Sequence, residues 1–443
     1  MEPDRPLGLH TDLYEIRMVE SYLRLGMHEP ATFSLFARPS KHRPVMIAAG
    51  LERAMNVLDR FRYGEEELAY LRAQRVPENA LAWFADMEVE GELWAVDDGT
   101  PVLGNEPFLE FTGPLPIAQL LETALMNAVH FDTLIATKAA RCVRAARGRR
   151  VVDFGFRRAH GLDAGLRVAA ASYLGGCDAT SNVEAGRRYG IPITGTMAHS
   201  FIQSFDDEVT AFREFMVDHP GQTTLLVETY DPIEGMRNAI RVAKQLGREG
   251  NPINALRIDS EPLEQLCREG RRMLDDAGLR DVKLVLSGGL DEERIDEIVR
   301  SGAPCDGFGI GSALATSSDH PALDVAYKLV EYAGKGRAKY SENKAIFPWR
   351  KQVYRSGDLE QDVMERREAT APGRPLLAPR WRNGRRLERP TLEEGRRRAL
   401  GLAASIPDHW LLPPEPERPP TPIIGPELEK IAKRVRRRIA PGS

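Results

Sequence analysis

The chain has 443 residues, 42% of them hydrophobic, so it can bury more than one core and is expected to form two or three domains, which excludes a single small binding module. Its net charge of -4 is uneven: residues 361–443 carry 18 Lys and Arg against 11 Asp and Glu, or +7, which leaves -11 for the first 360 residues, so a nucleic-acid partner is not expected. No apolar run of about eighteen residues could span a bilayer and no basic region precedes an apolar signal run, so we expect a soluble, cytoplasmic protein with no membrane partner.

Residues 1–133 are predicted to form an N-terminal α+β domain. Apolar residues recur at helical spacing between residues 8 and 27, and Asp12 with Glu15 three residues later predicts a capping box at the start of that helix. Two strand patterns follow at 31–37 and 87–96, and two helical patterns at 47–61 and 116–129.

From residue 150 the pattern changes to short β-rich runs, each followed by a helical segment. The seven runs are VVDFGF, CDATS, IPITGTMA, TTLLVET, NALRIDS, VKLVLSG and CDGFGIGS. So many βα units in succession favour a parallel barrel, and the G-x-G-x-x-G fingerprint of the open dinucleotide-binding sheet is missing. We therefore predict an α/β fold with an irregular (β/α) barrel of about seven parallel strands over residues 134–335.

Residues 336–443 are predicted to return to the N-terminal domain and then to form a basic, Pro-rich C-terminal extension. The proline run at 412–426 indicates a stiff connector. The last helix ends KRVRRRI, and cations there favour the helix dipole, which explains the basic tail more simply than RNA binding. The cysteines are dispersed without a C-x-x-C pair, so we expect buried thiols at Cys142, Cys177, Cys267 and Cys305.

The candidate chemistry gathers where the strand runs end, because the active site of a parallel barrel lies at the carboxyl ends of its strands. SGGL at 287–290 and GIGSA at 309–313 close the last two runs. A single glycine turn of this kind is usually only turn punctuation, but the last two strands are where barrels commonly bind a phosphate. The residues that can face a phosphate are Ser287, Gly288, Gly289, Gly309, Gly311 and Ser312.

His199, in GTMAHSF, lies at the end of another run. A histidine at a strand end is by itself more often a hydrogen-bonded structural residue than a catalytic one. Its neighbours Thr196 and Ser200 can donate to a phosphate, and Glu228 or Asp231 on the adjacent run can orient the imidazole. This setting favours a catalytic histidine.

Arginines and a carboxylate complete the candidate site. Arg157 and Arg158 can clamp a carboxylate or a phosphate, although an arginine pair there is as often a solvated face. Asp259 ends the run NALRIDS, where it can hold ribose hydroxyls or a magnesium ion. Arg257 lies two residues earlier on the same face of the strand. A structural Arg–Asp pair explains this pattern equally well.

Taken together, these motifs resemble the nicotinate phosphoribosyltransferase family from about Leu9 to Arg355. The matching segments are TDLY (11–14), LLET (120–123), FGFRRAHG (154–161), YLGGCDATSN (173–182), GTMAHSF (195–201), LVETYD (226–231), LRIDS (256–260) and DGFGIGSA (306–313). The resemblance implies a type II phosphoribosyltransferase fold, with nicotinate, phosphoribosyl pyrophosphate and ATP as substrates and Mg2+ as a cofactor. It also implies a homodimer with shared active sites, working in NAD biosynthesis and salvage.

The resemblance also assigns roles. His199 resembles a histidine that ATP transiently phosphorylates, and Tyr14 resembles a residue that stacks on the pyridine ring from the neighbouring subunit. Thr196, Arg257 and Arg158 resemble residues of the nicotinate pocket, and Ser312 stands where the family usually has threonine at the ribose phosphate. Together with the strand-end argument above, this predicts Asp259 as a second catalytic residue. The predicted phosphate and ribose contacts are Ser200, Ser287, Gly288, Gly289, Gly309, Gly311 and Ser312.

The chain departs from the family pattern at a few positions. IDSEPL stands where IDSGDL is usual, so Glu261 and Pro262 replace a glycine and an acid beside the ribose site, and Glu15 replaces a common glutamine. Two alternatives therefore stay open. One is a relative that uses nicotinamide or quinolinate, and the other is a catalytically weakened paralogue that binds phosphorylated ligands for regulation.

Overall fold

The computed structural model describes residues 5–248, 250–339 and 346–439. The chain forms two compact units, Met1–Thr137 with Ala322–Ser443, and Lys138–Pro321. The predicted segments 1–133 and 336–443 thus belong to one unit, and the second unit ends earlier than the predicted residue 335. The reason is that β12 (Val325–Tyr332) pairs antiparallel with β1 (Pro30–Ala37) in the first unit.

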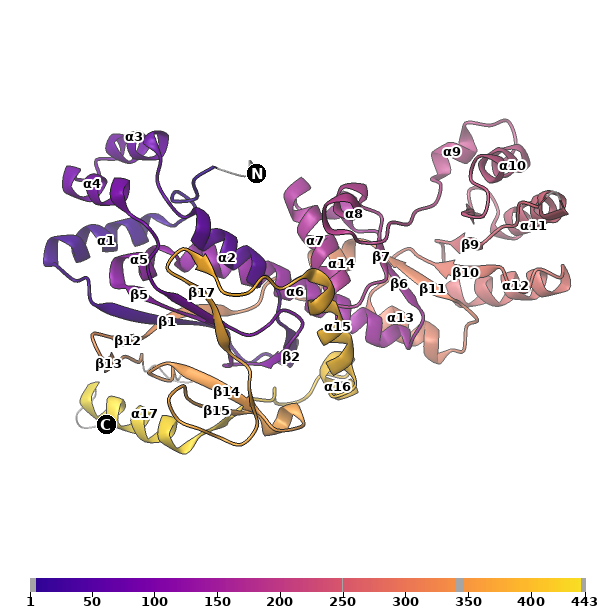
Figure 1. The fold of residues 1–443 in the computed structure, drawn as a ribbon. Helices are drawn as coiled ribbons and strands as arrows, with labels where there is room; N and C mark the ends of the chain where they lie inside the picture. Colours follow the sequence, from indigo (N-terminus) through magenta and orange to yellow (C-terminus); the bar gives the residue numbers. More distant parts are fainter. Residues whose placement is uncertain (1–4, 249, 340–345, 440–443) are drawn as a thin grey trace. The chain divides into compact units, whose positions relative to one another are not determined.

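The first unit is built on a seven-stranded antiparallel sheet (Figure 1). Its strand order is β13-β12-β1-β5-β3-β17-β18. Phe33 and Tyr327 stack face to face at 4.8 Å across β1 and β12, in the core of this unit. The predicted strand 87–96 is shorter in the structure. The remaining strands are β3 (Glu92–Ala95), β5 (Pro107–Pro114), β13 (Lys335–Gly336), β17 (Ala378–Arg382) and β18 (Arg385–Arg386).

The helices of the first unit follow the predicted order with different bounds. The predicted helix 47–61 is α2 (Leu51–Arg60), and the pattern at 116–129 divides into α5 (Leu115–Leu120) and a long α6 (Glu122–Ala146). The predicted capping box at α1 (Leu13–Leu25) does not form. Glu15 instead accepts hydrogen bonds from the Thr11 hydroxyl and the Thr123 hydroxyl and N–H. Two further helices are α3 (Glu65–Ala73) and α4 (Glu78–Asp86).

The last part of the chain adds a four-stranded sheet of order β16-β14-β15-β19 to the first unit, and β2 (Val45–Ile47) pairs with β4 (Pro101–Leu103) elsewhere in it. Its last helix, α17 (Pro426–Ile439), buries Leu428 and Val435 and exposes most of its cations. The other elements are β14 (Lys351–Arg355), η2 (Leu359–Gln361), β15 (Val363–Arg366), β16 (Arg374–Pro375), α15 (Leu392–Ala403), α16 (Asp408–Leu411) and β19 (Ile423–Ile424). Among the described residues, no helix is both long and apolar enough to cross a membrane.

The second unit contains a parallel sheet of order β7-β6-β11-β10-β9-β8, which forms a half-barrel. Six of the seven predicted runs are confirmed as strands. The seventh, IPITGTMA, contributes only a parallel bridge between Ile193 and Thr180, so the sheet is open between β7 and β8. The strands are β6 (Arg150–Asp153), β7 (Ala179–Thr180), β8 (Thr224–Leu226), β9 (Ala255–Ile258), β10 (Lys283–Leu286) and β11 (Gly307–Ile310).

Helical segments follow each of these strands, as expected for successive βα units (Figure 1). The four cysteines are buried thiols, as predicted. The helical segments of this unit are η1 (Phe156–Arg158), α7 (Leu162–Leu174), α8 (Val183–Tyr189), α9 (His199–Gln203), α10 (Glu208–Asp218), α11 (Pro232–Arg248), α12 (Leu263–Asp276), α13 (Glu292–Arg300) and α14 (Ser312–Thr316).

Candidate active site

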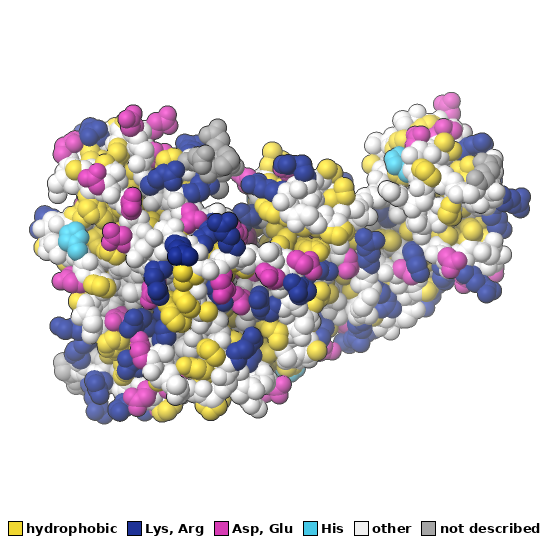
Figure 2. Space-filling view, in the orientation of Figure 1, with side chains coloured by type: hydrophobic (Ala, Val, Ile, Leu, Met, Phe, Trp, Pro, Cys, Tyr) yellow, Lys and Arg dark blue, Asp and Glu magenta, His cyan; other side chains and the backbone are white. Residues whose placement is uncertain are grey.

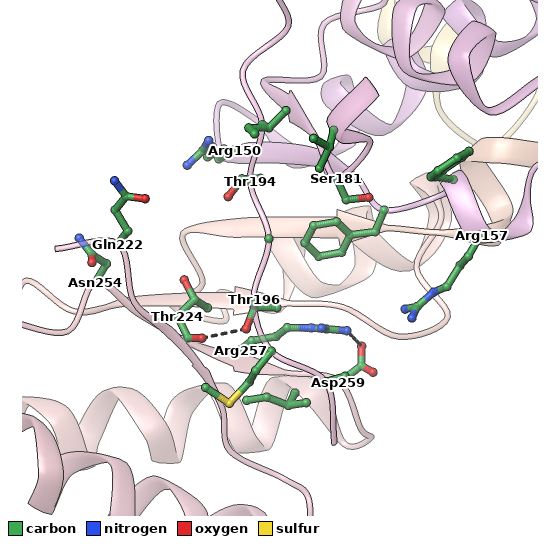
Figure 3. A pocket seen from close by; sticks show the side chains of 18 of the residues that line it. Arg150, Arg157, Ser181, Thr194, Thr196, Gln222, Thr224, Asn254, Arg257 and Asp259 are labelled. Atoms are coloured by element: carbon green, nitrogen blue, oxygen red, sulfur yellow. Dashed lines mark hydrogen bonds and ion pairs between the residues drawn. The ribbon is translucent and has the colours of Figure 1, made fainter. Parts of the chain in front are cut away.

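A cavity of about 990 Å³ lies in the half-barrel unit, along the segment that replaces the seventh strand (Figure 3). Its wall includes residues 193–199, which carry Thr196 and His199. Because this segment is not a regular strand of the sheet, its residues can line a cavity. A cavity of this size suits a small organic ligand.

Arg257 is the buried cation of the cavity. Its Nε donates to the Ser287 Oγ at 2.7 Å and its Nη2 to the Asp259 Oδ1 at 3.0 Å, while the guanidinium lies 5.5 Å from the centre of the Phe154 ring. The Ser287 hydroxyl also donates to Asp259. Arginine, serine and carboxylate thus fix one another across β9 and β10, and an aromatic face lies beside them.

Gly288 allows the turn after β10 to approach this network. A Cβ at this position would lie 2.2 Å from the Asp259 carbonyl oxygen, and the φ of Gly288 is +89°. Both facts require glycine there, because any side chain would clash in a left-handed conformation. The predicted turn at 287–289 is therefore packed directly against Asp259.

Glu228 connects β8 to the same network. Its Oε2 accepts the Asp259 N–H at 2.8 Å, and its Oε1 is buried without a hydrogen-bond partner. Burial raises the pKa of Glu228 above its usual value. Ligand atoms of His199, Glu228 and Asp259 all lie within 4.8 Å of one another. An orphaned carboxylate oxygen beside a second carboxylate is the donor chemistry that a divalent cation such as Mg2+ prefers.

His199 is exposed at the first position of α9. Its Nδ1 lies 3.2 Å from the Thr229 Oγ1, so the imidazole is oriented by Thr229, and neither Glu228 nor Asp231 makes the predicted contact. Thr196, three residues before His199, donates its hydroxyl to the Thr224 carbonyl at 2.8 Å and ties the cavity wall to β8 (Figure 3). An exposed, lightly held imidazole nitrogen is accessible to a reactant.

The cavity brings together Thr196, His199, Arg257 and Asp259 of the predicted site residues, with Ser287 one hydrogen bond away. Arg157, not Arg158, lines it, because both lie on the single turn of η1 and point differently. The predicted residues that do not line the cavity are Tyr14, Arg158, Ser200, Ser287, Gly288, Gly289, Gly309, Gly311 and Ser312.

The second glycine turn lies after β11. A Cβ at Gly309 would lie 2.3 Å from the Phe154 ring, so this glycine makes room for the aromatic side chain of the cavity. At Gly311 the nearest atom to an added Cβ is the Phe154 carbonyl oxygen at 3.8 Å. No protein contact therefore requires a glycine at position 311. Ser312 beside it is exposed at the start of α14.

Sequence reasoning missed several lining residues. Phe154 carries no polar signal in a buried run, and Arg150, Gln222 and Asn254 precede the strands instead of following them. They line the cavity because it extends along the open edge of the sheet toward the strands' amino ends (Figure 3). The missing seventh strand, which the sequence did not reveal, leaves this side of the sheet open.

The departure at Glu261 has a local explanation. Its carboxylate accepts a bond from Arg294 Nη2 at 2.9 Å and from the Leu263 N–H at 3.0 Å, at the start of α12. Glu261 is exposed and does not line the cavity. Basic and acidic side chains are interspersed over both units on the face that Figure 2 shows, so an anion would have to be bound by local groups such as these arginines.

The fold and the cavity together define a class: an α/β half-barrel protein with a small-ligand site built from arginine, hydroxyl groups, a carboxylate and a histidine. The model of the nicotinate phosphoribosyltransferase (NAPRTase) N-terminal domain matches residues 9–130, and that of the nicotinate phosphoribosyltransferase (NAPRTase) family matches residues 149–345. The chain belongs to the nicotinate phosphoribosyltransferase family.

Relatives in other organisms show the same likeness. The chain is 45% identical over 396 residues to nicotinate phosphoribosyltransferase pncB2 of Mycobacterium tuberculosis, covering 88% of this chain and 85% of the relative. It is 42% identical over 362 residues to the nicotinate phosphoribosyltransferase of Bacillus subtilis, covering 80% and 74%. The crystal structure of human nicotinic acid phosphoribosyltransferase is similar with a TM-score of 0.82 at 25% identity, over 96% of this chain and 99% of that one.

Proposed function

We propose that this protein joins nicotinate to phosphoribosyl pyrophosphate, giving nicotinate mononucleotide and pyrophosphate, in NAD biosynthesis and salvage. The pyridine nitrogen attacks C1 of the ribose as the C1–O bond to pyrophosphate breaks through an oxocarbenium-like state. The observation that carries the proposal is that a chain of this family places Arg257, Asp259 and His199 on one cavity. The protein's contribution is positioning and charge stabilisation.

Nicotinate binds beside Arg257 in this proposal. The guanidinium already uses its Nε and Nη2, and the remaining N–H groups can donate to the carboxylate of the substrate. The Phe154 ring beside it offers an apolar face to the pyridine. Thr196, on the cavity wall, completes the pocket, and Arg157 takes the anion-binding part that the sequence assigned to Arg158.

His199 is proposed to be the phosphate carrier that couples ATP to the reaction. A ring nitrogen attacks the γ-phosphorus of ATP, so that a P–N bond forms while the bond to ADP breaks, and later hydrolysis releases inorganic phosphate. The exposed imidazole, whose Nδ1 lies beside the Thr229 hydroxyl, supports this role. Ser200, the next residue, is exposed beside it and can donate to the transferred phosphate.

In this proposal, magnesium and the substrate's phosphates bind to the carboxylates and the glycine turns beside the nicotinate pocket. Glu228 and Asp259 would hold Mg2+, which supplies positive charge to the leaving pyrophosphate. The ribose phosphate would bind to the turns at 287–289 and 309–312, since Gly288 allows close backbone approach and Gly311 leaves open space. Asp259 would also accept hydrogen bonds from the ribose hydroxyls.

We further propose a homodimer in which Tyr14 reaches the nicotinate site of the second copy. Tyr14 and Leu13 are exposed at the start of α1, with 47% and 59% of their surfaces accessible, so they are free to contact another molecule. Burying such side chains against a partner is favourable.

The cytoplasmic location expected from the sequence also stays a prediction.

A steady-state assay with three substrates tests the proposed function. Purified protein with phosphoribosyl pyrophosphate, Mg2+ and ATP should form nicotinate mononucleotide from nicotinate, and should form product far more slowly from nicotinamide or quinolinate. Omitting ATP should slow the reaction without abolishing it. Preference for quinolinate would identify the alternative enzyme, and binding of phosphorylated ligands without turnover would identify the regulatory paralogue.

A further inference from the structure

A cluster of charged side chains, all buried except the partly exposed Asp319, lies in the half-barrel unit outside the cavity lining. The Lys138 ammonium donates to Glu292 and, at 2.8 Å, to the Asp319 Oδ1, and the Arg141 Nε donates to the second oxygen of Glu292 at 2.6 Å. Only 1% of the Lys138 side chain and 2% of that of Glu292 are exposed. None of these residues lines the cavity.

The cluster joins three separate segments of the unit. Lys138 and Arg141 lie one turn apart on α6, so they point to the same side. Glu292 is the first residue of α13 and immediately follows the turn 287–291, which contains Gly288 and Gly289. Asp319 lies in the turn 317–320, which directly follows α14 and is closed by hydrogen bonds between Ser317 and His320.

Both partners of Lys138 therefore belong to segments that continue from the two glycine turns. The turn after β10 leads to Glu292, and the turn after β11 leads through the short α14 to Asp319. One ammonium group bonds both. Lys138 therefore links the two segments to each other and to α6.

The burial of these charges needs an explanation beyond stability. Two positive and two negative side chains leave the cluster neutral, and burial that would raise the pKa of Glu292 is outweighed by Lys138 and Arg141, which lower it. Replacing a buried ion pair by apolar residues is often neutral or stabilising, so such pairs add little net stability, and in some proteins they specify one arrangement of the segments they join. The arrangement specified here is that of the two segments against α6.

We propose that Lys138 is a positioning residue, which holds the segments following the two glycine turns in a fixed relation and so sets the geometry of the phosphate-binding site. The inference rests on the proposed function, because that function places the phosphates at these turns. Arg141 supports Lys138 by bonding the second oxygen of Glu292 and fixing the orientation of its carboxylate.

The test compares a double variant with a matched control. Lys138→Met with Glu292→Gln preserves side-chain volume and leaves Arg141 and Asp319 as one charge of each sign. The control, Arg147→Met with Asp296→Asn, also removes an ion pair, of 3.1 Å, between the residue that follows α6 and α13, but touches neither turn. Thermal unfolding, the KM values for both substrates and calorimetric titration with pyrophosphate plus Mg2+ are measured for each.

We expect the KM for phosphoribosyl pyrophosphate and the Kd for pyrophosphate to rise about tenfold in the double variant, below the roughly hundredfold loss that a misplacement of about 1 Å can cause. The KM for nicotinate should not change, and the control should retain wild-type values for both substrates. Asp319→Asn, at a partly exposed position, provides a second variant that removes one of the two ion pairs and should change the same constants in the same direction.

Two results would overturn the inference. One is a lower unfolding temperature with unchanged phosphoribosyl pyrophosphate and pyrophosphate binding, which would make the cluster merely structural. The other is an equal rise in the KM of both substrates. Failure of the proposed function is distinguishable, because a wild-type protein that forms no nicotinate mononucleotide can still be titrated with pyrophosphate, and that titration decides the role of Lys138.

Discussion

Arg257→Lys perturbs the proposed nicotinate site while keeping its charge. The guanidinium fork bonds Ser287 and Asp259 at 2.7 and 3.0 Å and keeps further N–H groups for a ligand. A lysine ammonium is a single point of charge, so it cannot hold both partners in these directions and also meet a carboxylate. We therefore expect the variant to fold and to bind nicotinate more weakly.

The expected rise in the KM for nicotinate follows from the loss of one hydrogen bond to a charged group, which contributes roughly 1.5–3 kcal/mol to binding. At about 1.36 kcal/mol for each factor of ten, the KM for nicotinate should rise by roughly 10- to 150-fold. The KM for phosphoribosyl pyrophosphate should change much less. The preference for nicotinate over nicotinamide should also fall, because only nicotinate carries the carboxylate that Arg257 is proposed to bind.

The assay is chromatographic measurement of mononucleotide formation over a range of each substrate, with thermal unfolding recorded for every protein. Arg150→Lys is the matched control, because Arg150 lines the same cavity at the amino end of β6, away from Asp259. A stable Arg257→Lys protein with an unchanged KM for nicotinate and unchanged discrimination against nicotinamide would refute the assignment of Arg257.

Three further predictions follow from the structure. Gly311→Val should weaken phosphoribosyl pyrophosphate binding far more than nicotinate binding, since an added Cβ meets no protein atom closer than 3.8 Å; an equal loss for both substrates in KM measurements would indicate unfolding instead. Burial raises the pKa of Glu15 from 4.5 to about 7, so its contribution to stability is full below pH 4.5 and is lost as the pH rises through 7. Glu15→Gln should therefore gain up to about 3 kcal/mol relative to wild type across that window in denaturant titrations, and a difference that does not vary with pH would contradict the burial argument. Mixed dimers of Tyr14→Ala and His199→Ala chains should regain activity if Tyr14 acts on the second copy; no gain above the single variants, with subunit exchange verified, would exclude a shared site.

The repeat of strand runs predicted most of the half-barrel, but not its open side. IPITGTMA looks like the other runs in hydrophobicity. Pro192, however, has no N–H to donate to a sheet, and the hydrogen bonds of this segment reach β7 only through the Pro192 carbonyl and the Thr194 N–H. The missing N–H of Pro192 is thus one reason why this segment forms a cavity wall and not a strand. The pattern of apolar residues does not show this difference.

The candidate site was predicted best where strand geometry alone decides direction. Arg257 and Asp259 share a face because they are two residues apart, and the structure joins them by a hydrogen bond. The directions of side chains on turns are harder to predict from sequence. On η1, Arg157 lines the cavity and Arg158 does not. The predicted helix-capping role of Glu15 is wrong for a similar reason. Its local pattern fits a helix cap, but its carboxylate accepts hydrogen bonds from Thr123, which is distant in sequence.

The proposed role of His199 as the carrier of phosphate from ATP can be tested on the protein itself. The most direct measurement incubates the protein with γ-labelled ATP and Mg2+, then follows the label on the protein in acid and in base. We expect an acid-labile, base-stable label on the wild-type chain and none on His199→Ala, which should keep only slow, ATP-independent formation of nicotinate mononucleotide. A wild-type protein that takes up no label, or a His199→Ala protein that still does, would refute the role of His199 as a phosphate carrier.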